Sequence, residues 1–399
     1  MMKPAWHYRP EKNWINDPNG LVQLNGWYHM FYQYNPHGDQ WGDIHWGHAR
    51  SKDLLHWETL PIALTPDTAK GELHCFSGGC CKDEMGRPHF FYTSIGDENK
   101  GRGALHDAQQ WYAEPADDDL LTLIQTDENA LTDAIHGDMH VQDWRDPCVL
   151  RHGDGYLMVL GGCVQGRGCV LLYTSPDMRH WTYRHILARS DKADGVPWEC
   201  PNFIPVDGKY ALFYSPCAAV RVKAGTLDDE LRFHEESDEV FEPERNGYYA
   251  PQAFTDERGR PLVIGWMPEG DNVPHKGWSG VMSPARELHI TADGLCALPI
   301  PGIEELPGVQ RLSIPRTELP KTWTLHDNGE ERTLLTLAAD GMLTLDRSAS
   351  TLAESPDKHP LTRQVPVKDV NDVFIAVDGS AVETMVNGKW LSARIYPTK

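Results

Sequence analysis

The chain has 399 residues and a formal net charge of −21, with 40% hydrophobic residues, 14 Trp and 14 Tyr. A chain this acidic is not expected to bind nucleic acid or an anionic membrane surface, because both require a basic face. No run approaches the ~20 apolar residues of a membrane span, and residues 1–17 lack the apolar core of a signal peptide, so we expect neither a membrane protein nor an exported one.

The nine cysteines are scattered without a disulfide-scaffold pattern. Together with the missing export signal they indicate reduced thiols and predict a cytoplasmic protein. Cys75, Cys80 and Cys81 are too irregularly spaced for a zinc site. His45 and His48 have nothing nearby that completes a ligand set, so we predict no metal.

Five short stretches between residues 1 and 295 share one pattern. In each, a glycine is followed by an apolar or aromatic run, and the runs span residues 27–34, 88–94, 156–162, 209–216 and 261–267. Counting back nine residues from Gly26, Gly86, Gly155, Gly208 and Gly259 reaches Asp17, Ser77, Asp146, Glu199 and Ala250. Such a repeat indicates one small β-unit used five times around a shared core. In a radial arrangement the three carboxylates would share one pocket.

The units are predicted to consist of strands. Their apolar runs are short, often alternate, and are interrupted by Gly, Pro, Asn and Asp. The units recur about every fifty to seventy residues, which leaves room for about four short strands, the size of a propeller blade. A second repeat, S-x-D-x-x-H-W, occurs at 51–57 and 175–181, each time after the apolar run of its own unit.

The composition changes near residue 295. Residues 296–310 lie in a proline-rich segment that we interpret as a linker, and residues 311–399 contain Asp-Gly and Asn-Gly turns between alternating runs. This is the signature of β-hairpins. It predicts a small antiparallel β-sandwich that covers or braces the first domain.

The three carboxylates occur in W-I-N-D-P-N-G at 14–20, W-R-D-P at 144–147 and W-E-C-P at 198–201. Each alone could be an ordinary turn residue. Together they would be crowded like charges, which folds retain mainly where chemistry needs them. Two carboxylates facing a scissile bond are what glycoside hydrolysis requires, and a third can hold substrate hydroxyls.

On these motifs the chain resembles glycoside hydrolase family 32, the β-fructofuranosidases. Further matches follow in order along nearly the whole chain, at 31–36, 41–48, 76–78, 249–252, 265–267 and 283–288. The resemblance implies a five-bladed β-propeller followed by a β-sandwich. It also implies retaining hydrolysis that releases terminal β-fructofuranosyl units through a covalent fructosyl-enzyme, with no metal or organic cofactor.

Carried over by position, the resemblance makes Asp17 the nucleophile, Glu199 the acid/base and Asp146 the transition-state stabiliser. The implied fructose-binding residues are Trp14, Ile15, Asn16, Gln33, Trp41, Phe76, Ser77, Arg145 and Trp266. We expect Arg145 both to fix Asp146 and to donate to a sugar hydroxyl.

The chain departs from the family pattern in three places. Ile15 stands where Met is commoner, residues 246–252 read NGYYAPQ where an Asp and a Phe usually precede the Tyr, and the terminal module is short. A fructosyltransferase and a catalytically silent fructan-binding protein remain alternatives, as does a related five-bladed enzyme that acts on arabinosides.

The preferred fructoside is left open among sucrose, sucrose 6-phosphate and short fructo-oligosaccharides. A phosphate would need basic residues at the rim of the pocket, and Lys52, Arg102 and Lys276 are the residues considered. The sequence also leaves open whether the protein forms a homo-oligomer.

Overall fold

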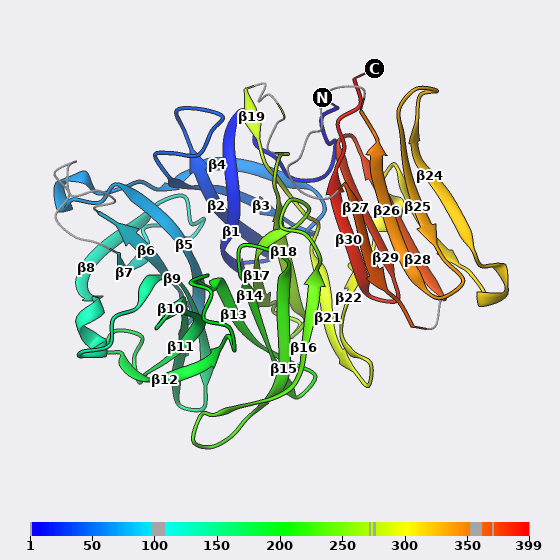
Figure 1. Ribbon diagram of the computed structural model, residues 1–399. Coiled ribbons are helices and arrows are strands. Elements are labelled where there is room, and N and C mark those ends of the chain that lie inside the picture. Colours follow the sequence, from blue (N-terminus) through cyan, green and yellow to red (C-terminus); the bar gives the residue numbers. More distant parts are fainter. Residues whose placement is uncertain are drawn as a thin grey trace.

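The computed structural model describes residues 2–96, 108–270, 273, 277–351, 361–368 and 371–398. Within these residues the chain forms strands and four single turns of 3-10 helix, and it contains no α-helix. The prediction of an all-β protein is therefore confirmed. Figure 1 shows two parts, the larger formed by the chain up to about residue 300 and the smaller by the remainder, with both termini beside the smaller part.

The larger part consists of five sheets that follow one another along the chain, each built mainly from consecutive antiparallel strands. The first contains β1 (Asn13–Leu24), β2 (Trp27–Asn35), β3 (His45–Ser51) and β4 (Trp57–Leu64). The second contains β5 (His74–Lys82), β6 (Pro88–Ile95), β7 (Gln109–Pro115) and β8 (Leu123–Leu131). The third contains β9 (Gln142–His152), β10 (Gly155–Val164), β11 (Arg167–Ser175) and β12 (Thr182–Arg189).

The fourth sheet contains β13 (Glu199–Val206), β14 (Lys209–Ser215), β15 (Val220–Leu227) and β16 (Phe233–Glu242). The fifth contains β17 (Tyr249–Thr255), β18 (Pro261–Met267), β20 (Val281–Met282), β21 (Arg286–Thr291) and β22 (Gly294–Pro299). A two-residue strand, β19 (Trp278–Ser279), leaves this region and pairs in parallel with β1. The five predicted apolar runs coincide with β2, β6, β10, β14 and β18.

The first strands of the five sheets form a closed ring. β1 contacts β5, β5 contacts β9, β9 contacts β13, β13 contacts β17, and β17 contacts β1. Segments far apart in the sequence therefore meet around one axis, as the repeat predicted. The single turns η1 (Thr68–Lys70) and η2 (Asp133–His136) lie in loops outside this ring.

Each of the five first strands contains a β-bulge at the same place. Two of its residues lie opposite one residue of the second strand, and the bulged pairs are 16–17, 76–77, 146–147, 200–201 and 250–251. A bulge re-aims side chains locally. Asp146, Cys200 and Ala250, each followed by proline, adopt positive φ angles of 66°, 47° and 45°. Such backbone strain in a non-glycine residue is typical of functional sites.

The bulges correct one detail of the predicted repeat. Asp17 and Ser77 are the second residues of their bulged pairs, Asp146 is the first of its pair, and Glu199 precedes its pair. The three acids therefore do not occupy one equivalent position. The count of nine residues back from a glycine aligned the three acids only in sequence. Strand and turn lengths differ between the sheets, so the same count reaches different positions relative to each bulge. Gly155 is itself the first residue of β10 rather than part of a turn.

The S-x-D-x-x-H-W repeat forms the same turn twice, between β3 and β4 and between β11 and β12. In the first copy, one carboxylate oxygen of Asp53 accepts hydrogen bonds from the amides of Leu55 and His56, and the other oxygen lies 2.8 Å from the His56 ring. Asp177 and His180 make the same ring contact at 2.8 Å in the second copy. The repeat is therefore structural, at equivalent places in two sheets.

The smaller part has two four-stranded sheets. One contains β23 (Val309–Ser313), β28 (Asp372–Asp378), β29 (Ala381–Val386) and β30 (Lys389–Arg394). The other contains β24 (Lys321–Asp327), β25 (Arg332–Leu337), β26 (Met342–Ala349) and β27 (Thr362–Pro366), and the single turns η3 (Ile303–Glu305) and η4 (Arg316–Glu318) precede them. Side chains of both sheets share one buried core that includes Leu335, Leu345, Ile375 and Leu391. Asp-Gly or Asn-Gly pairs lie in the connections from β24 to β25, β25 to β26, β28 to β29, and β29 to β30.

A buried chain of ion pairs joins the two parts and the N-terminal segment. His7 contacts Asp378 and Glu383, each at 3.0 Å. The guanidinium of Arg286 contacts Glu383 at 2.6 Å and Glu242 at 2.9 Å. Because none of these five side chains is more than 4% exposed, the charges depend on one another for compensation.

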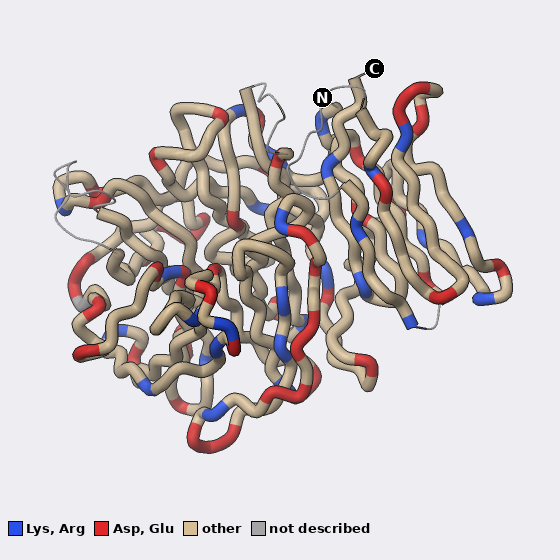
Figure 2. Tube along the Cα trace, in the orientation of Figure 1, with Lys and Arg blue, Asp and Glu red and all other residues tan. Residues whose placement is uncertain are grey.

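Acidic residues are spread over both parts of the molecule (Figure 2), consistent with the net charge of −21. None of the helices that the structure describes has the length and apolar character needed to cross a bilayer.

Candidate active site

A cavity of about 370 Å³ opens where the first strands begin. It is lined by Trp14, Asn16, Asp17, Gln33, Trp41, Phe76, Arg145, Asp146, Glu199, Cys200, Arg245, Tyr249 and Trp266. A larger cavity of about 430 Å³ lies along the first strands as well, lined by residues such as Leu21, Cys81 and Phe254 that come later in those strands. We place the site in the smaller cavity because only there do the three predicted acids meet.

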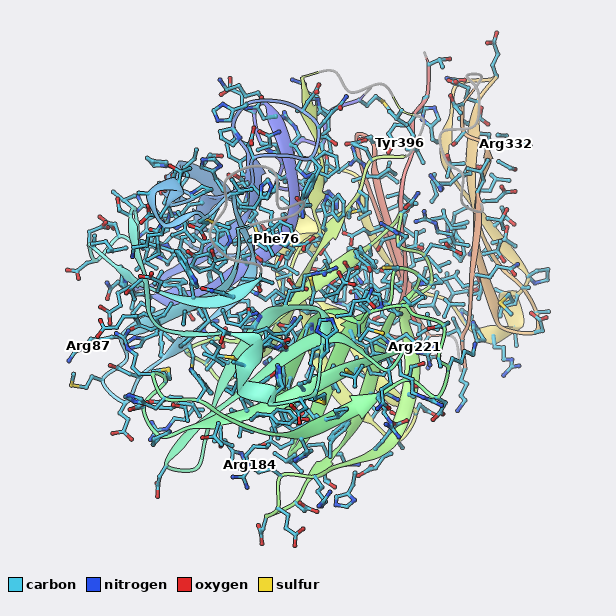
Figure 3. All side chains as sticks on the ribbon, turned by 60° about the vertical axis from the view of Figure 1, so that its left-hand side comes forward. Phe76, Arg87, Arg184, Arg221, Arg332 and Tyr396 are labelled. Atoms are coloured by element: carbon cyan, nitrogen blue, oxygen red, sulfur yellow. The ribbon has the colours of Figure 1, made fainter. Side chains whose placement is uncertain are left out.

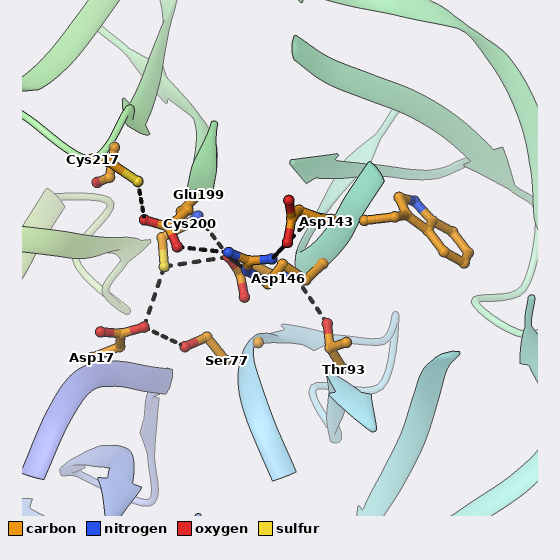
Figure 4. Close-up of polar contacts among 12 residues, drawn as sticks. Asp17, Ser77, Thr93, Asp143, Asp146, Glu199, Cys200 and Cys217 are labelled. Atoms are coloured by element: carbon orange, nitrogen blue, oxygen red, sulfur yellow. Dashed lines mark hydrogen bonds and ion pairs between the residues drawn. The ribbon is translucent and has the colours of Figure 1, made fainter. Parts of the chain in front are cut away.

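The three carboxylates come from three different sheets and gather around Cys200 (Figure 4). The Sγ atom of Cys200 lies 3.4 Å from Oδ2 of Asp17 and 3.5 Å from Oδ2 of Asp146. Arg145 contacts Oε1 of Glu199 at 2.7 Å and Oδ2 of Asp146 at 3.8 Å. The predicted convergence of Asp17, Asp146 and Glu199 is thus present in the structure.

Asp17 is held by neutral donors. The Ser77 hydroxyl donates to its Oδ2 at 2.6 Å, and the amide groups of Asn16 and Gln33 donate at 3.1 and 3.4 Å. Burial raises the pKa of Asp17 above its ordinary value, the hydrogen bonds from Ser77 and Asn16 oppose this, and the charge of Glu199 adds to the increase. Hydrogen bonds without a cationic partner orient the carboxylate and leave its charge uncompensated.

Asp146 is the most deeply buried of the three acids, with 6% of its side chain exposed. Burial raises its pKa to about 7; Arg145 and the Cys200 amide, which donates at 2.8 Å, act in the opposite direction, and Asp17 and Glu199 add to the increase. The backbone amide of Asp146 donates to the Thr93 hydroxyl at 2.9 Å, which fixes the bulge. Asp146 can therefore hold a proton close to neutral pH.

Arg145 is a shared counterion. Its guanidinium contacts Asp143 at 2.8 Å in addition to Asp146 and Glu199, and these charges raise its pKa further even though burial acts to lower it. The sequence predicted the pairing with Asp146. It did not predict that the stronger contact is with Glu199, from the neighbouring sheet.

Glu199 is more exposed than Asp146, with 23% of its side chain accessible. The Tyr249 hydroxyl donates to its Oε2 at 2.5 Å, and Sγ of Cys217 lies 3.4 Å from the same oxygen. Both oxygens of the carboxyl group are therefore held, Oε2 by Tyr249 and Oε1 by Arg145. The accessible part of its side chain lines the cavity.

Aromatic rings form the walls of the cavity. Trp41 is 46% exposed, and its ring centroid lies 6.0 Å from that of Phe76. Trp14 packs edge-on against Trp266, with 5.7 Å between the centroids. Flat apolar faces next to hydrogen-bonding side chains suit the binding of a sugar ring.

Two predicted sugar-binding residues are placed differently. Ile15 is fully buried in the hydrophobic core and does not line the cavity, because its side chain points away from the bulge that carries Asp17. Ser77 lies behind Asp17 and lines a small adjoining space with Pro18 and Asn19. It contacts Asp17 and Gln33, and so it supports the acid rather than facing the cavity directly.

Of the three residues considered for phosphate binding, the structure describes only Lys52, and its position does not support that role. Lys52 follows β3 at the end of the sheet remote from Asp17, and its ammonium group stacks on Trp27 at 3.7 Å. Arg102 and Lys276 lie outside the described residues. Arg245 and Tyr249 line the cavity and were not predicted as site residues.

The paired histidines have structural contacts. His48 is buried, lies 3.0 Å from a ring nitrogen of His29 and stacks on Phe31, and His45 contacts its neighbour Asp43. Over the described ranges no group of three or more His, Cys, Asp or Glu side chains has the arrangement of a metal site.

Comparison with known proteins gives the class and then the family. A nearly all-β chain that surrounds a sugar-sized cavity with carboxylates and aromatic rings has the arrangement of a glycosidase, and the protein is one. The family description "Glycosyl hydrolases family 32 N-terminal domain" matches residues 7–299, and the chain belongs to this family.

Two relatives illustrate the similarity over the full chain. The chain is 30% identical to a sucrose-6-phosphate hydrolase of Escherichia coli, over 99% of this chain and 89% of that protein. It is also 30% identical to a raffinose invertase of Escherichia coli, with the same two coverages.

Solved structures agree in fold. The sucrose-6-phosphate hydrolase of Lactobacillus gasseri superposes with a TM-score of 0.84 at 23% identity, covering 99% of this chain and 88% of that one. A family 32 beta-fructofuranosidase of Bombyx mori superposes with a TM-score of 0.80 at 26% identity, covering 99% and 89%.

Proposed function

We propose that this enzyme is a retaining β-fructofuranosidase that releases terminal β-fructofuranosyl units from sucrose, sucrose 6-phosphate or short fructo-oligosaccharides. The observation that carries the proposal is the convergence of Asp17, Asp146 and Glu199 in one aromatic-walled cavity. The names of the relatives, which include sucrose-6-phosphate hydrolase and raffinose invertase, support this substrate class.

In the proposed first step, a carboxylate oxygen of Asp17 attacks the anomeric carbon of the fructosyl unit. The bond from that carbon to the leaving oxygen breaks, and Glu199 gives its proton to the leaving oxygen. The Ser77 and Asn16 hydrogen bonds hold Asp17 in line for this attack. The oxocarbenium-like transition state carries positive charge close to Asp146, whose carboxyl group can bind ring hydroxyls.

In the second step Glu199 removes a proton from water. The resulting nucleophile attacks the same carbon and expels Asp17 as a free carboxylate. Arg145 and Tyr249 keep Glu199 oriented in both steps because they contact opposite oxygens of its carboxyl group. Trp14, Asn16, Gln33, Trp41, Phe76 and Trp266 are the proposed walls of the fructose subsite.

We further propose that the five sheets are the blades of a five-bladed β-propeller (1–295), followed by a linker (296–310) and a short β-sandwich (311–399). The closed ring of first strands and the shared core of the last two sheets support this reading. We place the enzyme in the cytoplasm, in agreement with its nine unpaired cysteines.

The proposal is tested by comparing kcat/KM on sucrose, sucrose 6-phosphate, kestose and inulin. Retention is tested by running the reaction with added methanol, which should trap methyl β-fructofuranoside and no α-anomer. The α-anomer would contradict the role of Asp17 as nucleophile. Fructose release at high sucrose, measured against oligosaccharide formation, distinguishes hydrolysis from transfer.

A further inference from the structure

Arg245 is a cation in the active-site cavity that the proposed reaction does not use. It belongs to the connection between β16 and β17, and it lines the same cavity as the three carboxylates. Its guanidinium carbon lies 5.2 Å from the centroid of the Tyr249 ring, which is a cation–π contact. A buried or half-buried arginine at a binding cavity is a specific anion receptor when its donors are not already occupied.

The two arginines of the cavity differ in their partners. Arg145 contacts Asp143, Asp146 and Glu199, so its charge is already shared among carboxylates. Arg245, by contrast, forms no ion pair with any carboxylate in the part of the chain that the structure describes; its guanidinium rests on the Tyr249 ring. Its N–H donors therefore remain available to a ligand.

The position of Arg245 relates it to the leaving group rather than to fructose. Tyr249, on which the guanidinium rests, donates its hydroxyl to Oε2 of Glu199 at 2.5 Å. Glu199 is the proposed acid that protonates the leaving oxygen. Asp17 and its supports Ser77 and Asn16 belong to β1 and β5, different strands of the ring. A leaving sugar whose oxygen is protonated by Glu199 would thus lie on the side of the cavity that Tyr249 and Arg245 line.

The cavity next to the active site, which is the other space that could hold the leaving sugar, has a different electrostatic character. A neighbouring cavity of about 420 Å³ shares Phe76 and Arg145 with the active site and is also lined by Asp133 and Asp143. Its one shared cation is the arginine already paired with three carboxylates. An anionic group would be repelled there and attracted toward Arg245, in a protein whose overall charge of −21 otherwise disfavours anions.

From these observations we infer that Arg245 determines leaving-group specificity by binding a phosphate monoester on the departing sugar. This inference rests on the proposed function and selects sucrose 6-phosphate among its substrates. The planar guanidinium can donate two parallel hydrogen bonds to phosphate oxygens, which an uncharged leaving sugar cannot match. Tyr249 then has two roles, since it orients Glu199 and supports the arginine.

The experiment compares the ratio of kcat/KM on sucrose 6-phosphate to kcat/KM on sucrose in the wild type and in Arg245→Gln. The ratio should exceed one in the wild type and fall about 10- to 100-fold in the variant, the range expected for a charge-assisted contact. Arg245→Lys keeps the positive charge and loses the paired N–H donors of the guanidinium. Its ratio should lie between those of the wild type and Arg245→Gln. Glucose 6-phosphate should inhibit the wild type more strongly than glucose does, and this difference should disappear in Arg245→Gln.

Arg184→Gln is the matched control. Arg184 is exposed on β12, the outermost strand of its sheet, and it projects at the outer side of the molecule in Figure 3. The substitution changes the net charge by the same unit, so an unchanged ratio in this variant shows that the effect belongs to the cavity. Melting temperatures of all variants verify that each is folded.

The other outcomes overturn the inference. Three results would show that Arg245 does not recognise the phosphate. They are a wild-type ratio below one, an unchanged ratio in Arg245→Gln, or an equal loss of kcat/KM on both substrates. If the wild type releases fructose from no fructoside, the proposed function itself fails and the inference with it. Activity on fructosides without any effect of Arg245 on the ratio rejects the inference alone.

Discussion

Ser77 donates its hydroxyl proton to Oδ2 of Asp17 across 2.6 Å and thereby connects the first strands of two neighbouring sheets. Gln33, from the second strand of the first sheet, donates to the Ser77 hydroxyl oxygen in turn. Asp17 is therefore positioned by neutral donors, and the single oxygen of an asparagine in its place could still accept from Ser77 and Gln33.

Asp17→Asn should abolish turnover and keep the fold. The amide oxygen still accepts from Ser77, whereas it cannot attack an anomeric carbon, so kcat on sucrose should fall at least about 10³-fold. Because burial and Glu199 raise the pKa of Asp17, removing its charge should not lower the melting temperature. Single-turnover kinetics and thermal unfolding check the two parts. A near-normal kcat in this variant would exclude Asp17 as the nucleophile.

Glu199→Gln should affect substrates according to their leaving groups. Without a proton donor, kcat/KM on sucrose should fall about 10²- to 10⁴-fold. An activated aryl β-fructofuranoside, whose phenolate leaves without protonation, should lose much less in the first step. The measurement is a comparison of pre-steady-state bursts on both substrates. Equal losses on both would show that Glu199 does not protonate the leaving oxygen.

Asp146→Asn should stabilise the fold at neutral and alkaline pH while it removes activity. The pKa of Asp146 is raised to about 7 from an ordinary value of 3.8, mainly by burial. Because the pKa of Asp146 is raised on folding, protonated Asp146 contributes fully to the unfolding free energy at a pH below 3.8. This contribution is lost as the pH rises through about 7. The variant lacks this loss, so its advantage in unfolding free energy should grow between pH 5 and pH 8, up to about 4 kcal/mol.

Chemical denaturation at several pH values measures this difference. Glu230→Gln, at a side chain 78% exposed on an outer loop, is the control and should show no such trend. A pH-independent difference for Asp146→Asn would contradict the placement of Asp146 as a buried, protonatable group.

His7→Gln should destabilise the junction between the two parts most strongly at mildly acidic pH. Burial acts to lower the pKa of His7, but the contacts with Asp378 and Glu383 raise it overall. Charged His7 thus contributes fully to the unfolding free energy at a pH below its ordinary pKa of 6.5. This contribution is lost as the pH rises through the raised pKa. The pKa values of Asp378 and Glu383 are lowered, so their contributions are lost at the acid end.

We expect the loss of unfolding free energy to be about 3–5 kcal/mol at pH 6 and smaller at pH 9, because removing one partner leaves buried charges uncompensated. His56→Gln, at an exposed pair with Asp53, should cost less than about 1 kcal/mol. A loss for His7→Gln that is the same at both pH values would show that the charge of His7 does not contribute.

The sequence predicted most of the architecture because glycines and apolar runs mark the strand order directly. The second strands of all five sheets and the hairpins at Gly341, Gly379 and Gly388 lie where the pattern placed them. The register of the bulges was not predictable. It depends on turn lengths that differ between sheets, and so the three acids were assigned to one equivalent position when they occupy three.

The site was predicted as a set of residues, and less well as a network. Motifs identify Asp17, Asp146 and Glu199, and a closed ring brings them together. The contact of Tyr249 with Glu199 and the position of Arg245 in the cavity depend on elements that are remote in sequence. No local sequence pattern therefore predicts them. Ile15 shows the converse, because it lies only two residues before Asp17 in the motif and yet is buried in the hydrophobic core and does not line the cavity.

The backbone amides of Ala5, Trp6 and His7 all donate to the carboxylate of Asp378, at 2.6 to 2.9 Å. These three amides are therefore fastened to an acceptor that lies 371 to 373 residues further along the chain. During synthesis the ribosome must pass Asp378 before this attachment can form, so the three amides wait for their acceptor until the strands of all five sheets have been made.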